Sequence, residues 1–292
     1  MFINSFITTP SDMAARRIAV TLNEEAFLAT WKHYRSPYTK QLSESLTDDG
    51  KALILDQFVA EHTVEIGEYD PAALYLARCG LSYPVSSQLR YHPALDYPYE
   101  GLDLGKFPAM VAVMRAPRGQ ARKLYRTYLT PEGRLADVPH PRMVTDERTY
   151  PLKSCLELHQ PRGGVIGIAL SLESALAVYH DYAVPTVAAI TYQNLANFTA
   201  PKEARHLIIF ANNDLAALDS ALVLSDRAKA AGLTVKIMRL PESSPSWCAL
   251  RAKRLPYING CEPDFFLQRP YPLPAALAAL YSRSMCVLPL PF

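Results

Sequence analysis

The stretch "HLIIFANNDLAALDSALVLSDRAKAAGLTVKIM", His206 to Met238, contains one complete strand–helix–strand unit. An apolar run at 207–211 ends in polar residues and continues into a helical pattern, and a second apolar run, 233–238, follows a glycine. This order is typical of a parallel βαβ unit. Polar residues at the C-terminal end of such a strand are where α/β proteins place metal ligands and substrates. The stretch therefore predicts an α/β fold with a candidate site at Asn212, Asn213 and Asp214.

The alternation of strands and helices extends upstream of this unit. Strands are expected at 165–170, 186–190, 207–211 and 234–238, and helices at 172–181, 193–198 and 214–231. Strands alternating with helices predict a partly parallel sheet with helices on both faces. The fold class is therefore α/β, and helical and β-rich segments precede the sheet.

Changes in sequence pattern divide the chain into four regions. Asp70-Pro71 begins a helix that Gly80 ends, and Pro117-Arg118-Gly119 forms the turn of a hairpin. One more helix is expected near 274–284. The regions are a helical N-terminal region (1–84), a β-rich basic subdomain (85–162), an α/β domain (163–255) and a tail rich in proline and aromatic residues (256–292).

Composition describes a globular chain and excludes several classes. Of 292 residues, 49% are hydrophobic and 20% are charged, with a net charge of +2. The five cysteines are dispersed without a CxxC spacing, which argues against a disulfide framework or a zinc ribbon. No secretory signal and no apolar run of membrane-spanning length occur, so we expect a cytoplasmic protein without a membrane partner.

The near-neutral total conceals a basic segment. Lys106 to Arg162 contains 11 Lys or Arg and 5 Asp or Glu, a local balance of +6. Such charges usually lie on a solvated sheet face, but a phosphate backbone also favours them. Tyr125 and Tyr128 are interleaved with them and could stack on bases, although strand alternation lets only one of the two do so. The candidate nucleic-acid contacts are Lys106, Arg115, Arg122, Lys123, Arg126, Tyr128, Arg134 and Arg142.

The order of motifs resembles the Toprim primase-like proteins of phages, plasmids and other mobile elements. The resemblance runs from about Pro71 to about Leu250. It rests on an ordered series of motifs, namely "YLARCGL", "LRYHPAL", "KFPAMVAVMR", "YRTYLTPEGR", "GIALSLESALAVYHDYAVPTVAAITYQNLANF", "ARHLIIFANND" and "AAGLTVKIMRLPESSPSWCALRA". It implies a β-rich primase-like subdomain followed by a Toprim-like α/β domain.

The resemblance also implies an acidic site, because Mg²⁺ ions that serve nucleotidyl transfer prefer carboxylate oxygens. Members of the family end the first strand in Glu-Gly, end a later strand in Asp-x-Asp and carry a third, Asp-Trp-Asn-Asp-like segment. Here Leu170-Ser171 replaces the first motif, and Asn212-Asn213-Asp214 keeps only the second acid of the next. In the third motif, Trp247 marks the register and Ser246 and Ala249 replace both acids. No catalytic set is intact, and the degenerate positions are Leu170, Asn212, Ser246 and Ala249.

Two acidic residues survive near these positions. Glu173 and Asp214 could hold a weakly bound Mg²⁺, and no cofactor is required. Alternatively, Asp214 caps the following helix and Glu173 lies in the first turn of its own, where negative charge is favoured.

Three functions follow from these observations. The first is a catalytically inactive primase-like Toprim protein of a mobile element that binds single-stranded nucleic acid, a partner protein of replication or host defence, or both. The second is an active DNA primase or nuclease that uses Glu173 and Asp214. The third is a protein-interaction module on a Toprim scaffold.

Overall fold

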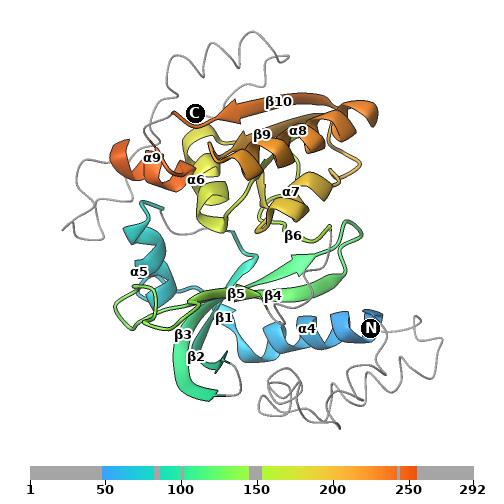
Figure 1. The fold of residues 1–292 in the computed structure, drawn as a ribbon. Coiled ribbons are helices and arrows are strands. Elements are labelled where there is room, and N and C mark those ends of the chain that lie inside the picture. The colour runs from blue at the N-terminus through green and yellow to red at the C-terminus, as the bar shows by residue number, and fades with distance from the viewer. Residues whose placement is uncertain (1–47, 82–85, 100–101, 145–152, 242–243, 255–292) are drawn as a thin grey trace. The chain divides into compact units, whose positions relative to one another are not determined.

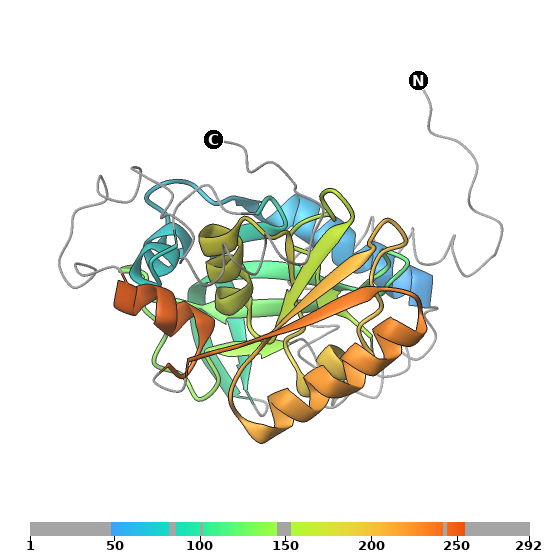
Figure 2. The ribbon, with the colours of Figure 1, turned by 90° about the horizontal axis from the view of Figure 1, so that it is seen from above.

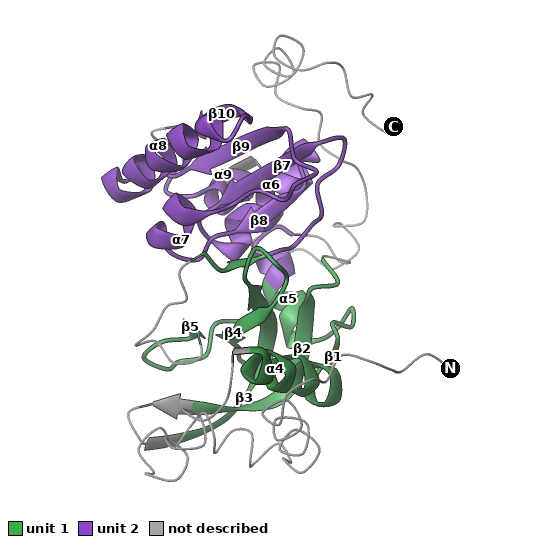
Figure 3. Cartoon of the chain, turned by 90° about the vertical axis from the view of Figure 1, so that its right-hand side faces the viewer, with its two compact units in different colours: residues 1–75, 86–156 green, residues 76–85, 157–292 purple. Residues whose placement is uncertain are grey.

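The computed structural model describes residues 48–81, 86–99, 102–144, 153–241 and 244–254. The chain divides into two compact units, coloured separately in Figure 3. Unit 1 consists of Met1–Tyr75 and Ser86–Leu156, and unit 2 of Leu76–Val85 and Glu157–Phe292. The first 47 residues of the predicted helical N-terminal region and the helix expected near 274–284 lie outside the described residues.

In its described residues, unit 1 is an antiparallel sheet against which helix α4 packs. Strand β3 is its centre, because β2 and β6 pair with β3, and β4 joins β3 to β5. The hairpin predicted at 117–119 is confirmed: Ala116 N donates to Gln120 O at 2.9 Å, and Gly119 has a φ of +82°. The elements are α4 (Asp48–His62), β1 (Val64–Glu65), β2 (Leu89–Tyr99), β3 (Leu102–Arg115), β4 (Ala121–Tyr128), β5 (Arg142–Val144) and β6 (Cys155–Leu156).

The core of unit 1 lies between α4 and the sheet (Figure 1). The rings of Tyr97 and Tyr128 meet edge to face with centroids 5.0 Å apart, and Phe107 packs against both. Offset and edge-to-face pairs of this kind add to the free energy of apolar burial. The helix contributes Ala52, Ile54, Leu55 and Phe58 to the same cluster.

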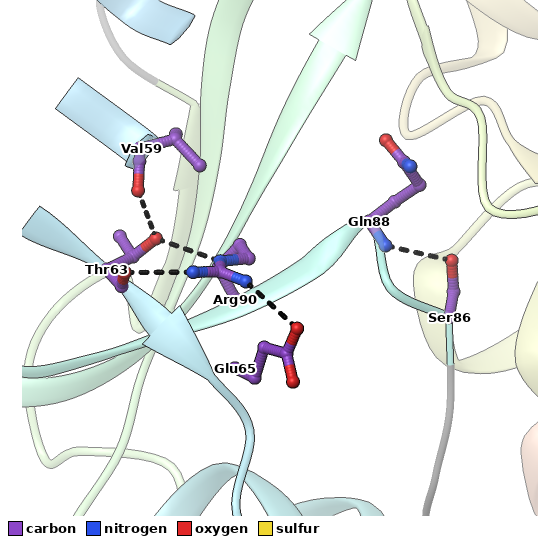
Figure 4. Close-up of polar contacts among 6 residues, drawn as sticks. All are labelled: Val59, Thr63, Glu65, Ser86, Gln88 and Arg90. Atoms are coloured by element: carbon purple, nitrogen blue, oxygen red, sulfur yellow. Dashed lines mark hydrogen bonds and ion pairs between the residues drawn. The ribbon is translucent and has the colours of Figure 1, made fainter. Parts of the chain in front are cut away.

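A polar cluster joins the end of α4 to strand β2 (Figure 4). Thr63 Oγ1 donates to Val59 O at 2.6 Å and accepts from Arg90 Nε at 3.2 Å. Arg90 Nη2 also donates to Thr63 O at 3.0 Å. Glu65 lies 3.9 Å from Arg90 Nη1, but its side chain is 90% exposed, so this ion pair contributes little. The guanidinium therefore acts mainly by satisfying the polar groups where the helix ends.

Unit 2 contains the parallel sheet that the sequence predicted, which confirms the α/β class. Its strand order is β8-β7-β9-β10, and all three pairings are parallel. Every residue of β7 is buried, as expected for a strand inside a parallel sheet. The elements are β7 (Val165–Ala169), α6 (Leu172–Tyr182), β8 (Thr186–Ala188), α7 (Tyr192–Asn197), β9 (His206–Ala211), α8 (Leu215–Ala230), β10 (Thr234–Arg239) and α9 (Trp247–Arg254).

Helices lie on both faces of this sheet. Figure 2 shows α6 and α9 on one side of the strands and α8 on the other, and α7 packs with α8. A further helix, α5 (Pro71–Arg78), begins after Asp70, and Gly80 follows it with a φ of +72°, as predicted. Among the residues that the structure describes, no helix combines the length and apolar character needed to cross a membrane.

In the α/β domain, the observed elements differ from the predicted ones by more than one residue at an end in two places. Strand β8 ends at Ala188 rather than at residue 190, because Ile190 adopts a φ of +69° and Thr191 already caps α7. Helix α9 was not predicted. It begins after Ser246, whose Oγ accepts from Ala249 N at 3.0 Å.

Candidate functional site at the strand ends

The positions that the resemblance marked lie at the C-terminal edge of the parallel sheet. The register of β7 and β9 pairs Ala169 with Phe210, so Leu170 lies at the level of Ala211 and next to Asn212 in the adjacent strand. Ser246 precedes Trp247, whose ring meets that of Phe210 at 90° with centroids 5.2 Å apart. The tertiary structure therefore brings Leu170, Asn212 and Ser246 to one edge.

Hydrogen bonds connect neighbouring strand ends. Ile190 N donates to Leu170 O at 2.7 Å, which joins the ends of β8 and β7. Asn213 Nδ2 donates to Leu240 O at 3.1 Å and to Pro241 O at 3.3 Å, which joins the ends of β9 and β10. The Asn213 amide thus has a structural role that needs no ligand.

Most of the polar side chains at this edge cap helices. Ser171 Oγ accepts from Ser174 N at 3.1 Å and Thr191 Oγ1 from Asn194 N at 3.1 Å. Asp214 Oδ1 accepts from Ala217 N at 2.8 Å. Each cap satisfies a backbone N–H that the first helical turn leaves without a partner. Together with Ser246, which precedes α9, these side chains cap the helices α6, α7, α8 and α9.

The two surviving acids belong to helices on opposite faces of the sheet. Glu173 is 7% exposed in the first turn of α6, and Asp214 precedes α8. Both carboxylates are at the positive end of a helix, which favours negative charge without a metal. The pKa of Tyr192 is raised by partial burial, then by a hydrogen bond to Asp214 and by its negative charge. The Asp214 carboxylate therefore contacts α7 as well as α8.

The donor chemistry of this edge does not fit a Mg²⁺ site. Leucine has no donor at 170, an amide replaces a carboxylate at 212, and serine and alanine stand at 246 and 249. Within the described ranges, no three His, Cys, Asp or Glu side chains come together in a way that could hold a metal ion. Mg²⁺ needs hard oxygen ligands in near-octahedral geometry, usually including carboxylates.

Two buried amides at this edge were not recognised as unusual from the sequence. Asn194 is 1% exposed, and within the described residues neither its Oδ1 nor its Nδ2 has a hydrogen-bond partner. Asn212 Oδ1 is also buried without a partner there. No local pattern could have revealed this, because the burial of these side-chain atoms depends on contacts with distant segments of the unit.

The predicted basic contacts of unit 1 differ widely in exposure. Lys106, Arg134 and Arg142 are exposed, and Arg115 and Arg122 are half-buried. Lys123 and Arg126 are buried, with 8% and 5% of their surface exposed. Arg118 was not among the predicted contacts, but it is exposed in the hairpin turn.

Several of the accessible cations already have partners. Lys106 Nζ lies 3.9 Å from Asp96 Oδ2, and Arg115 Nη2 lies 2.7 Å from Asp56 Oδ1. Arg142 Nη2 donates to the Tyr75 hydroxyl at 2.6 Å. The basic segment is therefore partly neutralised and partly buried rather than a uniformly open surface.

Both tyrosines of β4 are buried, which corrects the expectation that Tyr128 is a nucleic-acid contact. Tyr128 is 0% exposed and Tyr125 is 6% exposed. The Tyr128 hydroxyl donates to Asp96 O at 2.8 Å and accepts from Arg126 Nη1 at 3.1 Å. Its ring belongs to the core cluster beneath α4, so no base can stack on it. The same burial withdraws Lys123 and Arg126 from the surface.

Comparisons with known proteins match both parts of the chain. Residues 57–149 match DUF7146, a domain of unknown function, and residues 165–247 match the Toprim domain family. No curated protein matches the chain by sequence.

Solved primase structures are similar to the chain at low identity. The Aquifex aeolicus primase (zinc-binding and RNA polymerase domains) is 17% identical with a TM-score of 0.47, over 80% of this chain and 70% of that one. A DNA primase domain from Pseudomonas aeruginosa is 13% identical with a TM-score of 0.37, over 84% and 75%. The primase fragment of the bacteriophage T7 primase-helicase is 13% identical with a TM-score of 0.36, over 55% and 61%.

The Toprim match coincides with the parallel sheet of unit 2 and includes Leu170, Asn212 and Ser246. The DUF7146 match coincides with most of the described antiparallel sheet that precedes it. The chain therefore contains a Toprim domain at residues 165–247, preceded by the DUF7146 domain of unknown function at residues 57–149.

Proposed function

We propose that this Toprim primase-like protein is catalytically inactive and acts by binding a macromolecular partner. The observation that carries the proposal is the chemistry of the strand ends, where leucine, asparagine and serine stand at Leu170, Asn212 and Ser246. A leucine side chain cannot transfer a proton or hold a cation. A neutral amide is a weaker Mg²⁺ ligand than a carboxylate and leaves the edge less negative.

The use of Asp214 as a helix cap supports the proposal. One of its oxygens accepts from Ala217 N, so this acid already has a structural role. An active primase or nuclease based on Glu173 and Asp214 would have to form a metal site from two acids on helices that lie on opposite faces of the sheet. The setting on a phage, plasmid or other mobile element is supported only by the family resemblance.

Template-dependent primer synthesis tests catalytic inactivity. With Mg²⁺ or Mn²⁺, a single-stranded template and nucleotides, we expect no product, since loss of general acid–base help alone typically costs about 10²–10⁴ in rate. Primer synthesis by the wild type that Asp214→Asn abolishes would contradict the proposal. Asparagine caps helices about as well as aspartate, so that loss could not be attributed to unfolding. Asp219→Asn, an exposed acid of the same helix, is the matched control.

A second candidate function is the binding of single-stranded nucleic acid by unit 1. It is favoured by the accessible cations Lys106, Arg118, Arg122, Arg134 and Arg142. Burial removes Lys123, Arg126 and both β4 tyrosines from this surface, and two ion pairs neutralise part of the rest. Since little aromatic stacking surface remains in β4, this binding would be mainly electrostatic. The burial of these cations and tyrosines and the two ion pairs favour a protein, rather than a nucleic acid, as the main partner.

The salt dependence of binding separates these alternatives. Each phosphate contact with a single strand contributes about 0.7 to the slope of log affinity against log salt. Arg118→Ala combined with Arg134→Ala should therefore flatten the slope by roughly 1.4, if both residues contact phosphates. Arg205→Ala with Lys229→Ala removes two exposed cations of unit 2 and should leave the slope unchanged. If the wild type binds neither DNA nor RNA single strands at low salt, this candidate function fails and a protein partner remains.

A further inference from the structure

The residues that end helix α5 contact helix α9, and this contact lies within unit 2. Cys248 Sγ donates to Cys79 O at 3.5 Å, and Arg251 Nε donates to Gly80 O. Arg251 is 8% exposed and also forms an ion pair with Asp181. The carbonyl groups at the end of a helix have no partner within it. Two side chains of α9 therefore satisfy carbonyl groups where α5 ends.

The same contact brings together two cysteines that are 169 positions apart in the sequence. Cys79 and Cys248 both carry thiols, and both side chains are half-buried. Cys155, by contrast, is only 3% exposed in strand β6. Thiols react with small reagents only where the reagent can reach the sulfur. A small oxidant therefore reaches the Cys79 and Cys248 pair, whereas the fold shields Cys155.

The position of the Cys248 sulfur is close to the one it would take in a disulfide. Within one residue the carbonyl oxygen lies about 3 Å from Cβ. Cys248 Sγ, at 3.5 Å from Cys79 O, therefore lies no more than about 6.5 Å from Cys79 Cβ. In a disulfide, each sulfur is about 3 Å from the partner's Cβ. A change of side-chain rotamer moves a cysteine sulfur by about 3 Å, so the bond can close with little backbone movement.

We propose that Cys79 and Cys248 form a redox-active dithiol site that a low-molecular-weight disulfide, such as oxidised glutathione, converts into an intramolecular disulfide. The thiolate of one cysteine attacks a glutathione sulfur, the sulfur–sulfur bond breaks, and one glutathione thiolate leaves. The thiolate of the other cysteine then attacks the protein sulfur of this mixed disulfide and displaces the second glutathione. The two protein thiols lose two electrons and two protons, and oxidised glutathione gains them to become two glutathione thiols.

The disulfide fastens the end of α5 to the helix that reaches the strand ends. Helix α9 begins with Trp247, whose ring packs against Phe210 of β9, and Cys248 is the next residue. A crosslink between residues so far apart in the sequence also restricts the unfolded chain strongly, which stabilises the folded one. Oxidation therefore fixes α9 and raises the stability of unit 2. This inference is independent of whether the strand ends are catalytic and of whether unit 1 binds nucleic acid.

Oxidation of the full chain with oxidised glutathione at about pH 8, where ordinary thiols are partly ionised, tests the proposal. After alkylation of the remaining thiols, mass spectrometry of unreduced peptides should identify a link between Cys79 and Cys248. Mixing isotopically light and heavy protein shows whether the link lies within one chain. The midpoint of thermal unfolding should rise by roughly 5–10 °C on oxidation, and excess dithiothreitol should reverse both effects.

Single replacements show whether both thiols are needed. Cys248→Ser removes the thiol but keeps a hydroxyl that can donate to Cys79 O. It should prevent the link and the rise in midpoint, and leave a mixed disulfide between glutathione and Cys79. Cys79→Ser should likewise leave the mixed disulfide on Cys248. Cys155→Ala, at the buried cysteine, is the matched control and should retain both the link and the rise on oxidation.

Oxidation in concentrated urea tests whether the fold brings the two thiols together. The link should then form at least about tenfold more slowly, because the unfolded chain no longer holds residues 169 positions apart side by side. Any one of four results would overturn the proposal. These are no link in the wild type, a link only between two chains, equal rates with and without urea, or links to Cys155, Cys261 or Cys286 in place of the expected one.

Discussion

At the scale of single residues, Tyr128 shows how one side chain can suit two opposite roles. An aromatic residue among arginines is typical of base stacking, and the sequence analysis used it in this way. In the structure its ring packs edge to face with Tyr97 and its hydroxyl donates to Asp96 O at 2.8 Å. Its role is to satisfy buried polar groups and fill the core of unit 1.

Removal of the Tyr128 hydroxyl should therefore lower stability. Tyr128→Phe removes two buried hydrogen bonds, the one donated to Asp96 O and the one accepted from Arg126 Nη1, which should cost about 1–3 kcal/mol in the free energy of unfolding. Urea denaturation measures this cost. Tyr69→Phe, at a residue that is 74% exposed, is the control and should change stability by less than about 0.5 kcal/mol. Equal stability of the two variants would contradict the assigned role.

His159 should make the stability of unit 2 depend on pH. Its ring stacks on Tyr179 with centroids 3.7 Å apart, and its Nδ1 lies 3.4 Å from the backbone N of Thr186. Burial lowers its pKa, against a smaller opposite effect of the hydrogen bond with Thr186. The unfolded chain therefore binds the proton more readily than the folded one, so stability is full above about pH 6.5 and falls as pH decreases below it.

Thermal unfolding at about pH 8 and about pH 5 measures this effect, since the two conditions lie on either side of the ordinary histidine pKa. His159→Gln should reduce the difference in midpoint between the two conditions. His140→Gln, at an exposed residue of unit 1, is the comparison and should leave the difference in place. If the unfolding midpoint of the wild type rose on acidification, the predicted loss of stability at low pH would be wrong.

At the scale of elements, the central strand β7 depends on a close approach at Gly167. A Cβ atom there would lie 2.9 Å from Val184 Cγ1, 3.0 Å from the Phe210 ring and 3.2 Å from Thr186 Cγ2. The absence of a side chain thus lets β7 pack between its neighbours. The helices beside it begin at the short polar caps Ser171 and Asp214, and the sequence indicated only the second of these.

Gly167→Ala should destabilise unit 2 by about 1–3 kcal/mol, as is usual for overpacking in a core. Val184→Ala removes the methyl group nearest to the new atom. The double variant should therefore be more stable than the sum of the two single effects predicts, and a double-mutant cycle in urea measures that coupling. If the two effects on stability were strictly additive, a clash with Val184 would not be the cause of the destabilisation by Gly167→Ala.

At the scale of the whole molecule, the effect of Mg²⁺ on thermal unfolding is the simplest test of whether the strand ends bind a metal ion. Any ion that binds the folded chain and not the unfolded one raises the midpoint of thermal unfolding. We expect about 10 mM Mg²⁺ to leave the wild-type midpoint equal to that in NaCl of the same ionic strength. A variant with Leu170→Glu, Asn212→Asp and Ser246→Asp restores carboxylates and should be stabilised by Mg²⁺. Stabilisation of the wild type that Asp214→Asn removes would instead assign a metal to Asp214.

The sequence by itself determined the α/β class, the order of strands and helices from Val165 to Arg239, the hairpin at Gly119 and the end of α5 at Gly80. These features follow from hydrophobic periodicity and backbone preferences, which are local along the chain. It also indicated that Asp214 suits a helix cap, but could not exclude a metal ligand.

Only the tertiary structure decided which polar and aromatic residues reach solvent. Lys123, Arg126, Tyr125 and Tyr128 are buried, although their strand reads as a basic surface. For Tyr128 the covering element is α4, whose residues precede it by more than sixty positions. The exposed leucines of α8 and the meeting of Leu170 with Asn212 likewise depend on strand register and helix packing. Burial is a property of contacts between distant segments, so no local pattern in the sequence can specify it.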